Sequence, residues 1–313
     1  MSSESAAIMT PTIGVEGEIP FAATGTSKPS KTWYKVIGKL ESPPLIVLHG
    51  GPGTAHEYMT PLQEIYQRCN IPVIFYDQIG CGRSTRFPEE RPGSSFWTFD
   101  LFLKELANLI DHFNLHQLGF YIIGQSWGGM LGAAYACTRP KGLRKMILAS
   151  APASIPEFAK GSRELLAEMP ADIRQVIEEC EHDKDFDSPK YHAACSEFYG
   201  RYFCRLSPMP ELLQTGFKHL GEDCSAYQTL QGPSEFTIIG TFKNWEGWRE
   251  AHQVEADVLI LNGRYDEVRD AAIEPWFWAL PRVRWVTFEK SAHMPHIEEP
   301  ERFMDLCASF LGK

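Results

Sequence analysis

The chain has 313 residues, of which 43% are hydrophobic and 22% charged, and its formal net charge at pH 7 is −10. These values are ordinary for a globular protein and allow one large α/β domain with an inserted subdomain, or two domains. The acidic balance and the lack of a long basic cluster argue against a nucleic-acid partner. No apolar run approaches the length of a membrane span, and the first residues lack the pattern of a secretory signal, so no membrane partner is expected.

Eight cysteines are scattered along the chain without a CxxC pair. In the absence of a signal peptide, this usage predicts free thiols and a cytoplasmic location. Cys195, Cys204 and Cys224 lie near His192 and His219 in the sequence, but their spacings do not match those of a zinc site. No metal is therefore expected.

The elements expected along the chain alternate between strand and helix. Residues 1–11 are predicted to form a flexible tail. Apolar runs predict an antiparallel pair and then further strands, at 12–21, 31–37, 44–48, 72–76, 118–123, 145–149, 256–261 and 284–288. Helical patterns are expected at 54–69, 96–113, 130–136, 163–169, 171–180, 190–204, 245–252, 270–279 and 300–311.

The alternation stops in one stretch, 153–255, which is mostly helical in pattern. The sequence therefore predicts an α/β fold with a mostly parallel central sheet flanked by helices. Its core is expected to consist of residues 12–152 and 256–313, and residues 153–255 are expected to form an inserted helical cap.

Residues 124–129 (GQSWGG) stand between a predicted buried strand and a predicted helix. A G-x-S-x-G turn in this position is typical of a nucleophile elbow, which lifts the serine hydroxyl above the edge of the sheet. Ser126 is therefore the candidate nucleophile. The N–H of Trp127, at the start of the following helix, is a candidate donor to an oxyanion.

A second glycine-rich turn, residues 49–53 (HGGPG), follows the strand at 44–48. Such a turn brings backbone N–H groups close to a ligand, and we expect it to supply the other oxyanion donor. Gly51 is the preferred residue, and Gly50 is the alternative. In a third turn, residues 76–84 (YDQIGCGRS), we expect Asp77 and Arg83 to brace the loops, because no dinucleotide fingerprint is present.

A serine nucleophile needs a base, and the base needs an orienting carboxylate. Asp266 and His293 each follow a late predicted strand, and the order Ser126, Asp266, His293 is that of an α/β-hydrolase. Glu267 remains open as an alternative acid and His296 as an alternative base. The expected chemistry is acyl transfer through an acyl-serine, which requires no cofactor.

Together the segments 49–53, 76–84, 124–129, 263–266 (GRYD) and 292–293 (AH) resemble those of the proline iminopeptidase family of α/β-hydrolases, which includes tricorn-interacting aminopeptidases and L-amino acid amidases. The resemblance covers nearly the whole chain after the tail and implies the α/β-hydrolase fold with a helical cap. It also implies that carboxylates hold the free amino group of the substrate. Glu235, in residues 232–236 (GPSEF), and Glu267 match the positions that supply them.

The chain departs from the narrower prolyl iminopeptidases at Ile79, where those enzymes usually carry arginine. This departure favours the broader aminopeptidase or amidase branch. The predicted function is a serine hydrolase that cleaves an N-terminal residue from short peptides or hydrolyses an amino-acid amide. The alternatives are an esterase, thioesterase or acyltransferase acting on a small metabolite with the same triad, and a non-catalytic binding protein, against which the complete triad argues. The oligomeric state is not predicted.

Overall fold

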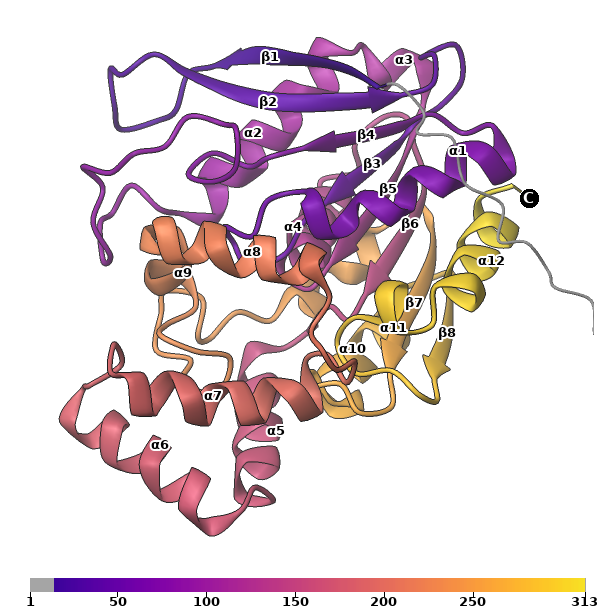
Figure 1. Ribbon diagram of the computed structural model, residues 1–313. Helices are drawn as coiled ribbons and strands as arrows, with labels where there is room; N and C mark the ends of the chain where they lie inside the picture. Colours follow the sequence, from indigo (N-terminus) through magenta and orange to yellow (C-terminus); the bar gives the residue numbers. More distant parts are fainter. Residues whose placement is uncertain (1–13, 313) are drawn as a thin grey trace, which may run out of the picture.

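The computed structural model describes residues 14–312, so the tail predicted at 1–11 lies outside the described residues. The described chain forms one eight-stranded sheet in the order β1-β2-β4-β3-β5-β6-β7-β8 (Figure 1). The strands are β1 (Val15–Phe21), β2 (Ser30–Ile37), β3 (Leu45–Leu48), β4 (Val73–Tyr76), β5 (Phe120–Gln125), β6 (Leu143–Ala149), β7 (Asp257–Gly263) and β8 (Val283–Phe288). The pairs β1–β2 and β2–β4 are antiparallel, and the remaining neighbours, from β4 through β3 and β5 to β8, pair in parallel. The predicted mostly parallel sheet is thus confirmed.

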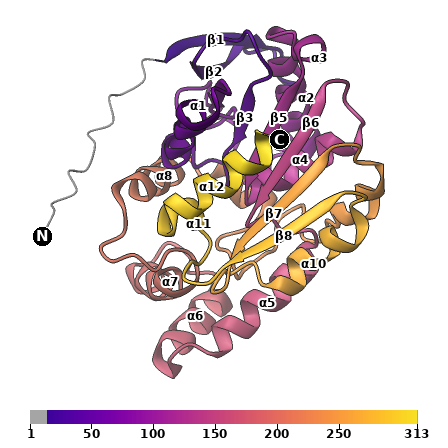
Figure 2. The ribbon, with the colours of Figure 1, turned by 90° about the vertical axis from the view of Figure 1, so that its right-hand side faces the viewer.

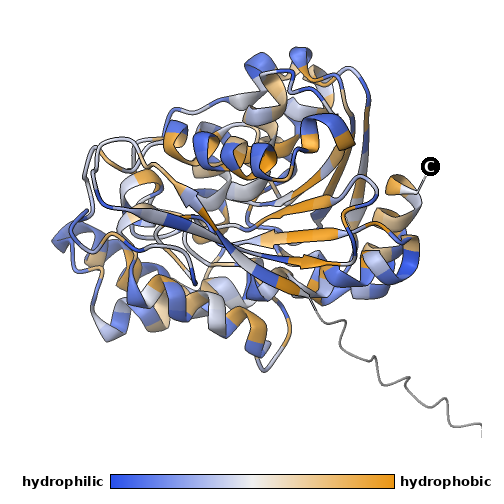
Figure 3. Ribbon diagram, turned by 90° about the horizontal axis from the view of Figure 1, so that it is seen from above, coloured by the Kyte–Doolittle hydropathy of each residue, from blue (hydrophilic) through white to orange (hydrophobic). Residues whose placement is uncertain are grey.

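Helices cover both faces of the sheet, because its central strands are apolar on both sides. On β3, Ile46 and Leu48 pack into one core with α2 (Phe99–His112), α4 (Trp127–Cys137) and α10 (Asp270–Ala279). Leu45 and Val47 pack into a second core with α1 (Glu64–Cys69) and α12 (Pro300–Leu311). Figure 2 shows the sheet between these helices, and Figure 3 shows hydrophobic strands between helices that carry both hydrophilic and hydrophobic residues.

The chain between β6 and β7 is mostly helical, as predicted, and forms the lower part of Figure 1. Its helices are α5 (Ile155–Ala167), α6 (Ala171–Asp183), α7 (Pro189–Tyr202), α8 (Glu211–Glu222), α9 (Ser225–Leu230) and the 3₁₀ helix η2 (Gly247–Gln253). Of these, α5, α6 and α7 enclose a small apolar core that includes Ile177, Tyr191 and Phe198. We call this stretch the inserted segment; whether 153–255 behaves as a separate cap domain stays a prediction.

Several helices differ from the predicted ones. The helix expected at 54–69 is a 3₁₀ helix, η1 (Glu57–Gln63), followed by the short α1, and Pro61 inside η1 has no N–H for an α-helical hydrogen bond. The helices α8 and α9 were not predicted; α8 contains Gly216 and Gly221, which lower the helix propensity. The short helices α3 (Leu115–Leu118) and α11 (Pro295–Glu298) were also missed. Among residues 14–312, no helix is long and apolar enough to cross a membrane.

Candidate active site

Ser126 occupies the turn between β5 and α4 with φ 53° and ψ −124°, a backbone conformation that costs energy for a residue with a side chain. Close packing around the turn explains its glycines. A Cβ on Gly124 would lie 2.3 Å from the carbonyl oxygen of Gly128, and one on Gly128 would lie 2.2 Å from that of Leu48. The turn can therefore form only with glycine at both positions, as the elbow pattern predicts.

Asp266 and His293 follow β7 and β8, the last two strands of the sheet. The Asp266 Oδ1 lies 2.7 Å from His293 Nδ1 and also accepts a hydrogen bond from the N–H of Val268. Burial opposes the charged form of His293, but the charge and hydrogen bond of Asp266 outweigh this effect, with smaller contributions from Glu235 and Glu298, so the pKa of His293 is raised. The predicted acid and base are thus brought together, and the Nε2 atom of His293 is left for other partners.

The two alternatives left open by the sequence occupy other positions. Glu267 lies on the other side of the imidazole, with Oε1 4.0 Å from His293 Nε2, so it does not orient Nδ1. His296 is buried, and its Nε2 donates to the carbonyl oxygen of Tyr58 at 3.2 Å. Burial lowers the pKa of His296 to about 4, and His296 does not line the cavity described next. The geometry therefore favours Asp266 and His293.

A cavity of about 410 Å³ lies over these groups. The α/β core contributes Gly51, Gln125, Ser126 and His293 to its lining. The inserted segment contributes mostly apolar and aromatic walls, from α7, α8, α9 and the neighbouring loops, which include Tyr191, Tyr199, Phe203, Leu213, Phe217 and Leu220. The sequence-predicted nucleophile and base thus open onto one largely apolar space of a size that suits a small substrate.

Two glutamates lie close to this cavity, of which Glu235 is half-buried and Glu267 is buried. Glu235 lines it, and its carboxylate accepts hydrogen bonds from the hydroxyl of Tyr227 at 2.6 Å and from Gln231 Nε2 at 2.9 Å. Glu267 is buried beside His293 and is not part of the lining. Neither of its carboxylate oxygens has a hydrogen-bond partner within residues 14–312.

The charges of these glutamates are costly in the structure as it stands. Burial raises the pKa of Glu235, partly opposed by the hydroxyl of Tyr227. Burial also raises the pKa of Glu267 well above its ordinary value, and the charges of Glu235 and Asp266 add to the effect. Buried carboxylates of this kind are stabilised by a cation that approaches both of them.

The two candidate oxyanion loops meet at Ser126. The N–H of Gly50 is already hydrogen-bonded to the hydroxyl oxygen of Tyr58, at 2.6 Å. Gly51 lines the cavity, and Trp127 is the first residue of α4, where the backbone N–H has no partner inside the helix. Gly51 and Trp127 are therefore better placed than Gly50 to donate to an oxyanion.

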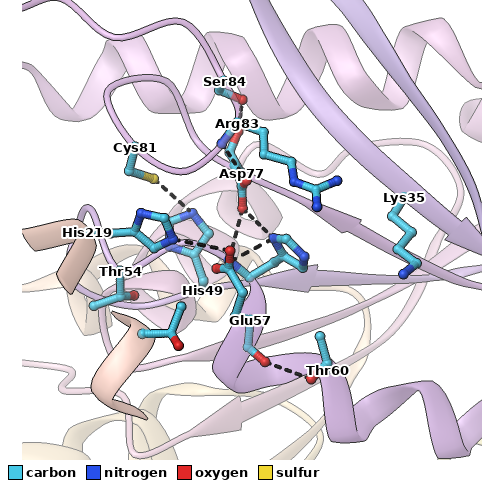
Figure 4. A network of polar contacts seen from close by, with 12 residues as sticks. Lys35, His49, Thr54, Glu57, Thr60, Asp77, Cys81, Arg83, Ser84 and His219 are labelled. Atoms are coloured by element: carbon cyan, nitrogen blue, oxygen red, sulfur yellow. Dashed lines mark hydrogen bonds and ion pairs between the residues drawn. The ribbon is translucent and has the colours of Figure 1, made fainter. Parts of the chain in front are cut away.

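Asp77 and Arg83 brace the neighbouring loops, as predicted. The carboxylate of Asp77 accepts from the N–H and the ring of His56, at 2.9 and 2.7 Å, and from the N–H of Arg83 at 2.9 Å. One group of residues in the described chain has ligand atoms close enough together to surround a metal. It consists of His56, Glu57 and Asp77. Figure 4 shows Glu57 and Asp77 in a polar network that extends to His219 on α8, whose ring lies 3.1 Å from Glu57. The hydrogen bond between His56 and Asp77 accounts for their proximity without an ion.

Ile79, where the chain departs from the narrower prolyl iminopeptidases, lies away from the cavity. The side chain is buried in the core with Trp97 and does not line the cavity. Its N–H donates to both carboxylate oxygens of the buried Glu105, at 3.0 and 3.1 Å. The absence of an arginine at this position therefore gives no direct reason to exclude proline.

Sequence reasoning missed several residues that hold the site together. Gln78 accepts from the indole N–H of Trp127 at 2.8 Å and donates to the carbonyl oxygen of His49 at 3.0 Å, and so connects the two candidate oxyanion loops. Tyr58 and Gln125 are hydrogen-bonded to each other at 2.7 Å. Gln78 and Gln125 stand next to residues that the motifs singled out, but Tyr58 has no sequence signal.

The chain is similar to known proteins over most of its length. Residues 43–300 match the family model of the alpha/beta hydrolase fold. A proline iminopeptidase of Heyndrickxia coagulans is 36% identical over 86% of this chain and 90% of its own length. The crystal structure of VinJ superposes with a TM-score of 0.89 at 37% identity, covering 95% of this chain and 98% of VinJ. The crystal structure of a proline iminopeptidase from Mycobacterium smegmatis superposes with a TM-score of 0.84 at 33% identity, covering 95% of this chain and 97% of that protein. The chain therefore belongs to the α/β-hydrolase fold and, within it, to the proline iminopeptidase family of serine hydrolases.

Proposed function

We propose that the protein removes an N-terminal residue, such as proline, from short peptides or hydrolyses amino-acid amides. In this proposal Ser126 Oγ attacks the carbonyl carbon of the first residue and gives its proton to His293 Nε2. His293 then passes the proton to the leaving amine, and water hydrolyses the acyl-serine by the same route. Asp266 holds the imidazole, and the N–H groups of Gly51 and Trp127 donate to the oxyanion.

The observation that carries the proposal is the pairing of Asp266 with His293 at 2.7 Å beside a cavity that is lined by both His293 and Ser126. This chain covers 90% and 87% of the lengths of two relatives that are named proline iminopeptidases. Their names support peptides with an N-terminal proline as a substrate class. The largely apolar walls of the cavity suit a proline ring or another apolar first residue.

Glu235 and Glu267 are proposed to bind the ammonium group of the substrate. Glu235 lines the cavity, and Glu267 is buried 4.0 Å from His293 with no hydrogen-bond donor in the described chain. An ammonium group would supply both charge and donors to these carboxylates. This arrangement would restrict the enzyme to substrates with a free amino terminus.

The inserted segment is proposed to act as a cap, residues 153–255, because it supplies most of the cavity wall. The eight cysteines are all free thiols, which supports a reducing compartment such as the cytoplasm.

The test is a panel of arylamides of proline, alanine, leucine and phenylalanine, each with a free and an acetylated amino group, beside the matching esters. We expect turnover of the free arylamides, and a loss of about 100-fold or more in kcat/KM on acetylation, because the acetylated substrate leaves the carboxylates unpaired. Ser126→Ala serves as the control and should abolish turnover.

Two outcomes would contradict the proposal. Equal turnover of free and acetylated substrates would reject the roles of Glu235 and Glu267. Turnover of esters without any turnover of arylamides would reject the peptidase and amidase activity and favour an esterase.

A further inference from the structure

Two adjacent backbone N–H groups, of Gly50 and Gly51, lie after β3 beside Ser126, and within residues 14–312 only that of Gly50 has a hydrogen-bond partner. The N–H of Gly50 donates to the hydroxyl oxygen of Tyr58 at 2.6 Å. The same hydroxyl donates to Gln125 Oε1 at 2.7 Å. One oxygen atom therefore links the loop after β3 to the residue that precedes Ser126.

The link continues to the loop after β8, which carries His293 and is called the loop of the base. Gln125 Nε2 donates to the carbonyl oxygen of His293 at 3.3 Å, and the carbonyl oxygen of Tyr58 accepts from His296 at 3.2 Å. Tyr58 and Gln125 are buried, and both border the cavity over Ser126. The chain from Gly50 through Tyr58 and Gln125 to His293 thus joins three loops that follow three different strands.

Close packing leaves little freedom at this junction. A Cβ on Gly50 would lie 2.7 Å from Gln125 Oε1, 3.0 Å from the Tyr58 hydroxyl and 3.3 Å from the Cβ of Ser126. The backbone of Gly50 is therefore in contact with the elbow itself. Gly51, with φ of 106°, turns away from this contact and lines the cavity.

We propose that the Tyr58 hydroxyl is a positioning group that selects the oxyanion donor. By accepting from Gly50 it keeps that N–H out of the cavity, so that the N–H of Gly51 is the one presented with that of Trp127. By donating to Gln125 it fixes the position of the Ser126 elbow relative to the loop that carries Gly50 and Gly51. The inference rests on the proposed acyl-serine chemistry and adds to it a residue that does not touch the substrate's reacting atoms.

The test is Tyr58→Phe, which removes one oxygen atom and keeps the aromatic ring. Because an oxyanion forms only in the transition state, we expect kcat to fall by roughly 10- to 100-fold with KM changed less than about twofold. The affinity for a boronic-acid analogue of the first residue should fall by a similar factor, whereas the affinity for the product amino acid should not change.

Tyr76→Phe is the matched control. Tyr76 is buried on β4, and its hydroxyl has no hydrogen-bond partner within residues 14–312, so the loss of this oxygen should leave kcat and KM unchanged. Rates are compared at equal folded fraction, measured by thermal unfolding, which separates loss of positioning from loss of fold.

An unchanged kcat in Tyr58→Phe would overturn the inference. So would a rise in KM with weaker binding of product, since Tyr58 would then bind the substrate. The rate at which a fluorophosphonate labels Ser126 provides a readout that needs no aminoacyl substrate, because the phosphonyl oxygen also needs the oxyanion donors. Slower labelling of Tyr58→Phe than of wild type would support the inference even if every arylamide failed, whereas equal labelling would reject it.

Discussion

At the scale of single residues, the imidazole of His293 is surrounded by negative charge. Asp266 is bound to its Nδ1, Glu267 lies 4.0 Å from its Nε2, and the charges of Glu235 and Glu298 also raise its pKa. In the proposed mechanism only the Asp266 carboxylate orients the ring. The remaining carboxylates have other roles, which can be separated by substitution.

Replacing Glu267 with glutamine should weaken substrate binding and stabilise the fold. The substitution removes a buried charge that has no hydrogen-bond donor in the described chain, so KM for free-amine substrates should rise by roughly 10- to 100-fold. The raised pKa of Glu267 makes the wild type lose stability as the pH rises above the ordinary glutamate value of 4.5, so the gain in Tm of the variant should grow with pH.

Steady-state kinetics and thermal unfolding at several pH values measure both effects. Glu289→Gln, an exposed glutamate that pairs with Arg264, is the matched control and should change neither quantity. An unchanged KM in Glu267→Gln would show that this carboxylate does not bind the amino group.

Glu298 holds the loop of the base from both sides. Its carboxylate accepts from the N–H groups of Ala292 and Met294, which flank His293, at 2.8 and 3.3 Å, and from that of Arg205 at 2.8 Å. The N–H groups of Ala292 and Met294 share Oε2 and that of Arg205 uses Oε1, so Glu298→Gln, with one carbonyl oxygen, cannot accept from both the His293 loop and Arg205. It also removes a charge that raises the pKa of His293.

We therefore expect two changes in Glu298→Gln: a loss of about 1–3 kcal/mol of stability, and a shift of the acidic limb of the kcat/KM profile to lower pH. In the wild type this limb should lie above the ordinary histidine pKa of 6.5, because activity requires neutral His293 and falls as the pH drops through a raised pKa. The pH–rate profiles of the two proteins provide the measurement, and an unshifted limb would count against an electrostatic role of Glu298.

At the scale of elements, α8 is attached to the core by charged side chains. His219 on α8 lies 3.1 Å from Glu57 on η1. Glu222, also on α8, lies 2.7 Å from Arg86. Figure 4 shows Glu57 next to His219. Since α8 also provides Leu213, Phe217 and Leu220 to the cavity wall, this attachment controls one side of the cavity.

The attachment of α8 should weaken as the pH rises. The hydrogen bond to Glu57 raises the pKa of His219, with Asp77 adding to the effect and burial and Arg86 opposing it. A group whose pKa is raised in the folded state adds stability at low pH and loses it as the pH rises through the raised pKa. Amide hydrogen exchange in residues 211–222, corrected for its intrinsic pH dependence, should therefore increase above about pH 6.5.

Glu57→Gln should remove most of this pH dependence. Glu197→Gln, which changes an exposed residue of α7 with no ion pair in the described chain, should keep it. If exchange in α8 showed the same pH dependence in Glu57→Gln as in wild type, the ion pair would not control the helix.

At the scale of the whole molecule, a buried carboxylate joins the antiparallel edge of the sheet to the loops of the site. Glu105 on α2 accepts from the hydroxyl of Thr32 on β2 and from the N–H of Ile79, in the turn after β4. That turn includes Gln78, which connects the two candidate oxyanion loops. Glu105 therefore couples the stability of the sheet to the geometry of the site.

Burial raises the pKa of Glu105 to about 8, so folding should become less favourable as the pH rises from about 4.5 to about 8. Glu105→Gln keeps an acceptor for Ile79 and abolishes the titration. We expect its Tm to be less sensitive to pH than that of the wild type across this range, with the control Glu178→Gln on exposed α6 behaving as wild type. Parallel pH dependences of Tm in the three proteins would contradict this role.

Most of the fold and the candidate triad could be predicted because they depend on local patterns. The strands β3 to β8 are short apolar runs, and the turns after them carry Ser126, Asp266 and His293 in an order that a parallel sheet gathers at one edge. The helices α8 and α9 could not be predicted in the same way, because their stability comes from packing over the cavity and not from local propensity.

The sequence by itself thus determined the fold class, the family and the candidate residues, since each of these is written in contiguous segments and in their order. Only the tertiary structure gave a reason to prefer Gly51 over Gly50, Asp266 over Glu267 and His293 over His296, because each preference depends on which atoms meet. It also buried Ile79 away from the cavity and brought Tyr58 to the elbow. Contacts between residues far apart in the chain are set by packing, which no local pattern contains.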